Sequence, residues 1–205
     1  MVRTADSIGS AIRALAEREP AFARVVEQLG VPEPRNSEPG ATTLLRTIVG
    51  QQVSVAAARS MWSKLEAAYG SPPDLPRLLV ATDEELRAAG ISRQKAGYVR
   101  SLAQLVLSGE LDLAALPADD EDAIALLTRI KGIGRWSAEI YLLFAEGRPD
   151  VWPAGDLAVQ VEIGRLLGLS ERPSEKRLRE LAERWSPHRG AAAILAWHSY
   201  NSSVL

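Results

Sequence analysis

The chain of 205 residues is long enough for one large core or two smaller ones, and it contains no cysteine. The absence of cysteine excludes disulfides, thiolate nucleophiles, iron–sulfur clusters and cysteine-ligated zinc, and two histidines argue against a histidine-based zinc site. A formal net charge of −2 argues against a broad basic surface for nucleic acid, although local patches and backbone amides bind phosphate without one.

No apolar run approaches the roughly 18 residues that cross a bilayer. The first twenty residues include acidic side chains and lack the apolar segment of a signal peptide. We therefore expect a cytoplasmic protein that does not associate with membranes.

Apolar residues recur at helical spacing along nearly the whole chain, and alternating strand patterns are essentially absent, so the predicted class is all-α. Pro20 interrupts the first helix, Gly30 is a C-cap candidate, Ser54 is an N-cap candidate, and Thr82 with Glu85 matches a capping box. The predicted helical segments are 7–19, 21–30, 42–69 with a break at 50–52, short helices within 71–92, then 93–109, 119–134, 135–147, 156–168, 174–185 and 188–203.

Residues 126–144, LLTRIKGIGRWSAEIYLLF, read as a helix, a Gly-Ile-Gly turn and a second helix. On composition alone, the simplest interpretation is a helical hairpin in which Gly132 ends one helix and Gly134 admits the next. A phosphate site is the other interpretation, because glycines let backbone amides approach an anion at a helix start. A dinucleotide-binding turn fits poorly, since a helix precedes the turn and Ser137 replaces the third glycine.

Four segments in order resemble the helix-hairpin-helix superfamily of DNA glycosylases, most closely its 3-methyladenine DNA glycosylase II branch. They are IVGQQVSVAAA at 48–58, GISRQKAGYVRSLA at 90–103, the hairpin block at 127–160, and RWSPHRGAAAILAW at 184–197. The resemblance implies a compact form without the β-rich domain of longer members. It implies a bilobal all-α fold with a central helical barrel, in which a cleft holds the extruded base. One lobe would contain residues 1–38 and about 157–205, and the other about 39–156.

The resemblance makes Asp156 the catalytic carboxylate. An Asp before a helix is more commonly an N-cap, and one residue can serve both roles. Such a carboxylate can stabilise positive charge on a deoxyribose as its glycosidic bond breaks, or orient or deprotonate water. Many relatives have a second acidic residue directly before this aspartate, whereas this chain has Gly155 there. Trp136 occupies the place of the Schiff-base lysine of strand-cutting relatives such as endonuclease III, which implies a monofunctional enzyme without lyase activity.

Trp136 and Trp197 are the implied walls of the base pocket. Alkylation at a purine ring nitrogen makes the base cationic, and aromatic faces attract cations by roughly 0.5–2 kcal/mol per contact. Ile140 stands where some relatives have a tyrosine. The remaining large aromatic residues near these motifs are interpreted as core or rim, namely Trp62, Trp152, Trp185 and Tyr141.

Gln52, at the helix break, is the implied wedge that enters the duplex where the base has left. The implied phosphate-binding hairpin consists of Lys131, Gly132, Ile133, Gly134 and Arg135. The resemblance also implies a sodium or potassium ion on the backbone carbonyls of Thr128, Ile130 and Ile133. Further basic residues that could contact phosphate are Arg93, Lys95 and Arg129.

The implied function is hydrolysis of the N-glycosidic bond of alkylated purines, 3-methyladenine and 7-methylguanine, in double-stranded DNA, which initiates base excision repair. The enzyme would be a monomer that requires no cofactor and has no iron–sulfur cluster. Alternatives are a non-catalytic helix-hairpin-helix DNA-binding protein, a glycosylase whose main lesion is hypoxanthine or 8-oxoguanine, and a helical interaction module. Asp156 argues against the first, Trp136 against the strand-cutting 8-oxoguanine enzymes, and the four ordered motifs against the last.

Overall fold

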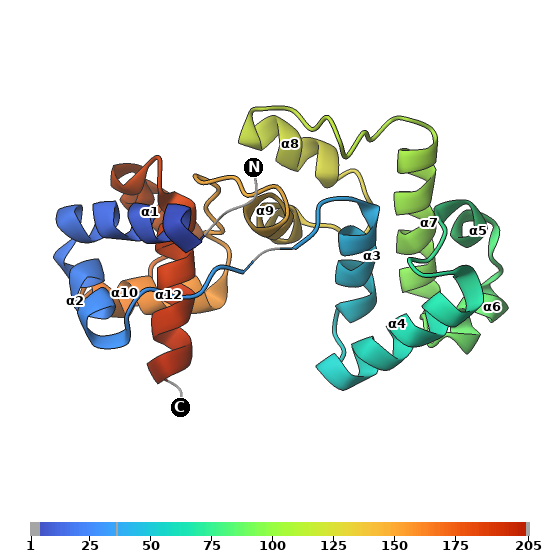
Figure 1. Cartoon of the computed structure of the whole chain (residues 1–205), viewed down its shortest axis with the longest axis horizontal. Coiled ribbons are helices and arrows are strands. Elements are labelled where there is room, and N and C mark those ends of the chain that lie inside the picture. Colours follow the sequence, from blue (N-terminus) through green and yellow to red (C-terminus); the bar gives the residue numbers. More distant parts are fainter. Residues whose placement is uncertain (1–4, 36, 204–205) are drawn as a thin grey trace. The chain divides into compact units, whose positions relative to one another are not determined.

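A computed structural model of the chain describes residues 5–35 and 37–203, and these residues form helices and connecting loops with no β-strand (Figure 1). The prediction of an all-α class is therefore confirmed. The elements are α1 (Ala5–Arg18), α2 (Pro20–Leu29), α3 (Ala41–Gly50), α4 (Val55–Tyr69), α5 (Leu75–Val80), α6 (Asp83–Ala88), α7 (Arg93–Leu107), α8 (Asp120–Leu127), α9 (Arg135–Phe144), α10 (Leu157–Leu166), α11 (Glu175–Ala182), a 3-10 turn η1 (Glu183–Trp185) and α12 (Arg189–Ser203).

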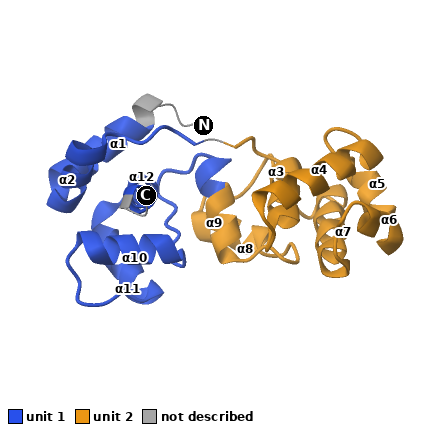
Figure 2. Cartoon of the chain, turned by 90° about the horizontal axis from the view of Figure 1, so that it is seen from below, with its two compact units in different colours: residues 1–36, 142–205 blue, residues 37–141 orange. Residues whose placement is uncertain are grey.

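The chain divides into two compact units, coloured separately in Figure 2. Unit 1 contains residues 1–36 and 142–205, and unit 2 contains residues 37–141. The sequence placed the second boundary near residue 156, whereas the structure places it within α9. Residues 142–156 group with unit 1 because Trp152 and Ala154 are buried in its core.

In unit 1, α12 is the central helix and contacts α1, α2 and α10. Its first half is almost entirely buried, and the small side chains of Ala191, Ala192, Ala193 and Ala196 let neighbouring helices approach closely. Large side chains from the other elements complete this core, including Phe22, which lies 5.0 Å from Trp185 between ring centroids. Trp197 lies at the start of the less buried second half of α12.

In unit 2, α7 is the central helix and contacts α3, α5 and α6. Three predicted caps are confirmed in the two units: Gly30 ends α2, the Ser54 hydroxyl accepts the Ala57 N–H before α4, and Thr82 with Glu85 forms a capping box on α6. These local signals fix where the helices begin and end. The helix break at residues 50–52 follows α3 and leads to the Ser54 cap.

Candidate functional site

Asp156 lies directly before α10 and caps that helix, as the sequence predicted. Its Oδ1 accepts the backbone N–H of Val159 at 2.9 Å, and its own N–H donates to the Pro153 carbonyl at 3.0 Å. Backbone amides and the positive end of the helix dipole favour negative charge at this position. The local sequence thus places a half-buried carboxylate at the end of a tight turn, where its charge is stabilised.

Trp197 contacts this carboxylate directly. Its indole Nε1–H donates to Oδ1 of Asp156 at 3.0 Å, so this oxygen accepts two hydrogen bonds from two different elements. The Trp197 ring also packs on Phe144, with ring centroids 5.7 Å apart and planes tilted by 33°. The structure therefore brings together two of the predicted site residues, Asp156 and Trp197, and fixes the orientation of the carboxylate.

An open cavity of about 340 Å³ adjoins Trp197 within unit 1. Phe144, Ile194 and Trp197 form its apolar wall, and Glu33 with His198 contributes polar edges. Small-molecule sites are typically clefts of about 300–1,000 Å³ with mostly apolar walls and a few polar groups. Arg35 also lines the cavity, and Asp156 does not; Trp197 connects the cavity with the carboxylate, because its ring lies in the wall and its indole N–H donates to Asp156.

The hairpin turn between α8 and α9 requires glycine at one of its two glycine positions. Gly132 has φ +85°, and a Cβ built on it would lie 2.2 Å from Cδ2 of Tyr98. At Gly134 a Cβ would meet open space, and the Gly134 carbonyl accepts the Ala138 N–H at 3.0 Å at the start of α9. Gly132 is therefore required because a side chain there would clash with Tyr98. The space beside Gly134 is open, so the backbone at the start of α9 is accessible.

The turn is anchored on α7 and on the loop after α3. Ser101 accepts the backbone N–H of Lys131 at 3.1 Å, and Gln51 donates its amide Nε2 to the Gly132 carbonyl at 2.8 Å. The Lys131 amide is thus engaged within the protein, although its side chain is exposed. Tyr98 and Ser101 were not predicted as part of the site from the sequence. The feature of the sequence that could have indicated them is their i, i+3 spacing, which places both side chains on one face of a helix.

Gln52, the predicted wedge, is exposed and has φ +55°, a left-handed conformation that is uncommon outside glycine. The preceding Gln51 is held by the hairpin, and the Val49 carbonyl at the end of α3 accepts Nζ of Lys95 at 2.8 Å. Burial lowers the pKa of Lys95. The chain just before Gln52 is therefore fixed at Val49 and Gln51, and Gln52 itself is exposed in a strained backbone conformation.

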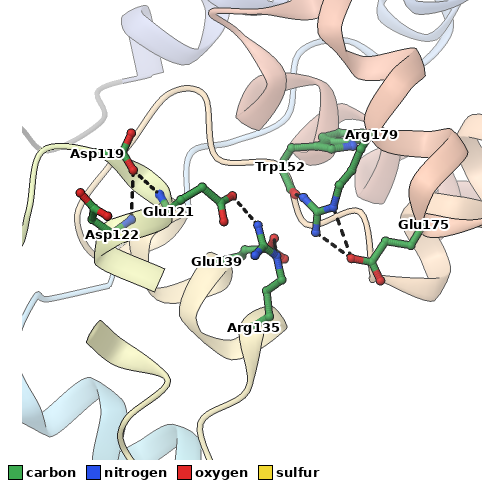
Figure 3. Close-up of polar contacts among 8 residues, drawn as sticks. All are labelled: Asp119, Glu121, Asp122, Arg135, Glu139, Trp152, Glu175 and Arg179. Atoms are coloured by element: carbon green, nitrogen blue, oxygen red, sulfur yellow. Dashed lines mark hydrogen bonds and ion pairs between the residues drawn. The ribbon is translucent and has the colours of Figure 1, made fainter. Parts of the chain in front are cut away.

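Arg135, predicted to bind phosphate, belongs to an ion-pair network in unit 2 (Figure 3). Its Nε lies 3.0 Å from Oε1 of the buried Glu139, and its Nη2 bonds Glu121. The hydrogen bond to Glu121 is the main reason why the pKa of Arg135 is raised above its ordinary value. Glu121 lies in the first turn of α8, and Asp119 caps this turn by accepting the N–H groups of Glu121 and Asp122. Arg135 thus connects α9 to the first turn of α8 through ion pairs within the protein.

Two of the other basic residues also have acidic partners. Arg129 pairs with Glu110, and Arg93 lies 3.6 Å from Asp83. Exposed ion pairs of this kind contribute little to stability. The prediction that these residues contact phosphate stays a prediction.

Trp136, the second residue of α9, belongs to unit 2 and is 47% exposed. The aromatic residues interpreted as core or rim are instead buried, and they are Trp62, Trp152, Trp185 and Tyr141. A large exposed tryptophan at the start of a helix is unusual and is commonly found at binding surfaces. The structure thus distinguishes Trp136 from the tryptophans of the core.

The sequence pattern of the family described as "HhH-GPD superfamily base excision DNA repair protein" matches residues 45–188, which include the helix break, the hairpin and Asp156. The chain belongs to this superfamily. This HhH-GPD protein is 28% identical over 164 residues to the putative DNA-3-methyladenine glycosylase YfjP of Bacillus subtilis, covering 76% of this chain and 57% of that one. It is 32% identical over 158 residues to DNA-3-methyladenine glycosylase 1 of Schizosaccharomyces pombe, covering 75% and 69%.

A solved structure with a similar fold is the 3-methyladenine DNA glycosylase Mag1 of Schizosaccharomyces pombe in complex with abasic DNA. The TM-score is 0.79 at 28% identity, and the alignment covers 96% of this chain and 97% of that one. The HhH-GPD chain is therefore comparable in extent with the Mag1 structure but spans little more than half the length of YfjP.

The monovalent cation expected on the backbone carbonyls of Thr128, Ile130 and Ile133 stays a prediction. Thr128 follows the last residue of α8, where carbonyls lie beyond the hydrogen bonds of the helix. The Ile130 carbonyl accepts the Ile133 N–H at 3.0 Å and has a second lone pair, as every carbonyl does. Neutral carbonyl oxygens suit sodium or potassium.

Within residues 5–35 and 37–203, no cluster of three or more His, Asp or Glu side chains is arranged to hold a metal ion. Over the same residues, none of the helices combines the length and apolar character that crossing a membrane requires.

Proposed function

We propose that this HhH-GPD protein is a monofunctional DNA glycosylase that releases alkylated purines, chiefly 3-methyladenine and 7-methylguanine, from double-stranded DNA. The observation that carries the proposal is the Asp156 carboxylate, which caps α10 and is oriented by Trp197. The names of its relatives support the same activity. In this role the protein starts base excision repair, acting as a monomer.

The reaction is a hydrolysis at the sugar carbon C1′. The bond from C1′ to the ring nitrogen of the base breaks, and its electron pair leaves with the base. Alkylation gives that base a formal positive charge, so it departs as a neutral molecule without a strong general acid. The Asp156 carboxylate stabilises the cationic sugar. A water oxygen then bonds to C1′ and gives up its proton, which leaves an abasic site.

The DNA contacts follow from the hairpin and the helix break. The first turn of α9, with accessible backbone at Gly134, is suited to bind a phosphate. A cation on the carbonyls of Thr128, Ile130 and Ile133 would add positive charge close to that phosphate. Gln52 is the residue proposed to enter the duplex, and Trp136 and Trp197 supply aromatic faces for the base. Because Trp136 has no amine, the enzyme forms no Schiff base and does not cut the strand.

The test is base release from methylated duplex DNA by wild-type protein and by Asp156→Asn. The wild-type protein should release methylated purines, identified by chromatography, and cut the strand only after alkali is added. Asp156→Asn keeps the size of the side chain but removes its charge, so it should lose base release while binding abasic DNA as the wild-type protein does. Release of no base by the wild-type protein would favour a non-catalytic DNA-binding protein. A second duplex that contains deoxyinosine tests the alternative lesion, and release of hypoxanthine from it without release of methylated purines would overturn the assigned substrate. Full activity of Asp156→Asn would overturn the assigned carboxylate.

A further inference from the structure

Arg179 of α11 holds the turn that leads to Asp156, and Glu175 of the same helix bonds Arg179 (Figure 3). Arg179 donates from Nη1 to the Trp152 carbonyl at 3.3 Å, and from Nη2 to Oε1 of Glu175 at 2.8 Å. Its Nε also lies 3.3 Å from the same carboxylate oxygen. Arg179 therefore connects the backbone of the turn to the start of α11.

Glu175 also lies close to the residue before Asp156. A Cβ built on Gly155 would be 3.5 Å from Oε2 of Glu175 and 3.8 Å from its carboxyl carbon. Gly155 has no side chain of its own, and a carboxylate from α11 lies over it. Oε1 of Glu175 thus accepts hydrogen bonds from Arg179, and Oε2 lies near Gly155 in the turn.

The turn itself is short and internally bonded, so that a shift at one end is transmitted to the other. The Ala154 N–H donates to Trp152 at 2.8 Å, and the Ala154 carbonyl accepts Nε2 of Gln160 at 2.8 Å. Asp156 donates its N–H to Pro153 at 3.0 Å. The Trp152 carbonyl that Arg179 binds is therefore four residues before the carboxylate, within one hydrogen-bonded unit.

We propose that Glu175 and Arg179 are positioning residues that hold the turn Trp152–Asp156 so that the Asp156 carboxylate meets the indole N–H of Trp197. The catalytic consequence rests on the proposed function, whereas the structural consequence does not. Enzymes lose rate steeply when a catalytic group is displaced, because a misplacement of about 1 Å can cost about a hundredfold. Neither side chain needs to touch DNA to affect the reaction.

The same helix offers a matched control. Arg177 and Glu180 form a second ion pair on α11, with Nη1 and Oε2 3.2 Å apart. Arg177 is 58% exposed, against 33% for Arg179, and the recorded partner of its guanidinium is Glu180 rather than the turn. Arg177→Met therefore removes an arginine from α11 without removing a contact to the turn.

The first experiment does not depend on activity. Proton–nitrogen NMR records the indole N–H signals of the five tryptophans, and Trp197→Phe identifies the signal of Trp197. Arg179→Met and Glu175→Ala should shift this signal, because the hydrogen bond to Asp156 changes, whereas Arg177→Met should leave it in place. A Trp197 signal that stays unchanged in folded Arg179→Met and Glu175→Ala would overturn the proposal.

The second experiment measures single-turnover base release from methylated DNA together with affinity for abasic DNA. Arg179→Met should lower the rate about ten- to a hundredfold with unchanged affinity. Arg179→Lys should recover part of the rate, since an ammonium can still donate to Trp152. Rates equal to wild type in both Arg179→Met and Glu175→Ala would refute the positioning role. Absence of base release from wild type would refute the proposed function instead, and the NMR result would still decide the positioning role.

Discussion

Trp197 donates its indole N–H to Oδ1 of Asp156 at 3.0 Å, and the same oxygen accepts the Val159 N–H at 2.9 Å. The tryptophan predicted as a wall of the base pocket is thus also a hydrogen-bond donor to the predicted catalytic carboxylate. The two donors come from α12 and α10, so the orientation of the carboxylate depends on how these helices pack. The two roles of Trp197, aromatic face and N–H donor, can be separated by mutation.

Trp197→Phe keeps an aromatic face but removes the N–H donor. A hydrogen bond to a charged group contributes about 1.5–3 kcal/mol, so the rate of base release should fall by about tenfold or more. Affinity for abasic DNA should change little, because the N–H contacts the protein rather than the DNA. Single-turnover kinetics and fluorescence anisotropy measure the two quantities. An unchanged rate in Trp197→Phe would mean that the hydrogen bond does not orient the carboxylate for the reaction.

Gly132→Ala should destabilise the protein by about 2 kcal/mol or more, because a left-handed backbone and a clash with Tyr98 add together. The structure gives φ +85° at Gly132 and a Cβ contact of 2.2 Å to the Tyr98 ring. Gly134→Ala is the matched control, since a Cβ there meets open space. Denaturant unfolding should show a loss for Gly132→Ala and little change for Gly134→Ala. Equal stability of the two variants would contradict the distinction between the two glycines.

The two glycines show what the sequence could and could not predict. Helical periodicity and caps predicted the all-α class and the hairpin, because these are local properties that neighbouring residues encode. The sequence could not show which glycine is required, because the answer depends on Tyr98, more than thirty residues earlier. Local sequence patterns do not reveal contacts between residues that lie far apart in the chain.

The same limit applies to the boundary between the units and to the surroundings of Asp156. Residues 142–156 follow the hairpin without a linker-like stretch, and long-range contacts assign them to unit 1, such as those of the buried Trp152 and Ala154 and the pair Asp150–Arg189. Asp156 itself was predictable, because an Asp before a helical pattern is a local cap signal and the surrounding motif resembles a known family. The carboxylate of Glu175 over Gly155 was not predictable, since eighteen residues of chain lie between Asp156 and Glu175.

Asp150 should make the stability of unit 1 depend on pH. Its Oδ1 accepts the Arg189 N–H at 3.0 Å at the start of α12, and its Oδ2 accepts Ser186 Oγ and Arg189 Nη2, each at 2.8 Å. Burial acts to raise the pKa of Asp150, but these hydrogen bonds outweigh it and leave the pKa below its ordinary value. Because the pKa of Asp150 is lower in the folded protein than in the unfolded chain, ionised Asp150 stabilises the fold at pH values above the unfolded pKa of about 3.9. This contribution is lost as the pH falls through the folded pKa.

The measurement compares wild type with Asp150→Asn by denaturant unfolding at pH 7 and near pH 3. The variant should be less stable by about 1–3 kcal/mol at pH 7, because the hydrogen bonds to a charged carboxylate are weakened. The difference should shrink at the lower pH, because the carboxyl of the unfolded chain is protonated first, below about 3.9, and this favours unfolding of the wild-type protein. A difference that stays constant between the two pH values would show that the charge of Asp150 does not matter.

Gln52 allows the backbone and the side chain of the proposed wedge to be tested separately. At φ +55°, Gln52→Gly removes an unfavourable backbone conformation and should raise stability by up to about 1 kcal/mol, partly offset by the flexibility of glycine in the unfolded chain. Gln52→Ala keeps the strained backbone and should leave stability nearly unchanged, since the side chain is exposed. Both variants lack the side-chain amide that is proposed to enter the duplex, so both should release base more slowly. A normal rate in both would exclude Gln52 as the wedge, and a slow rate in Gln52→Gly alone would assign the effect to loop flexibility.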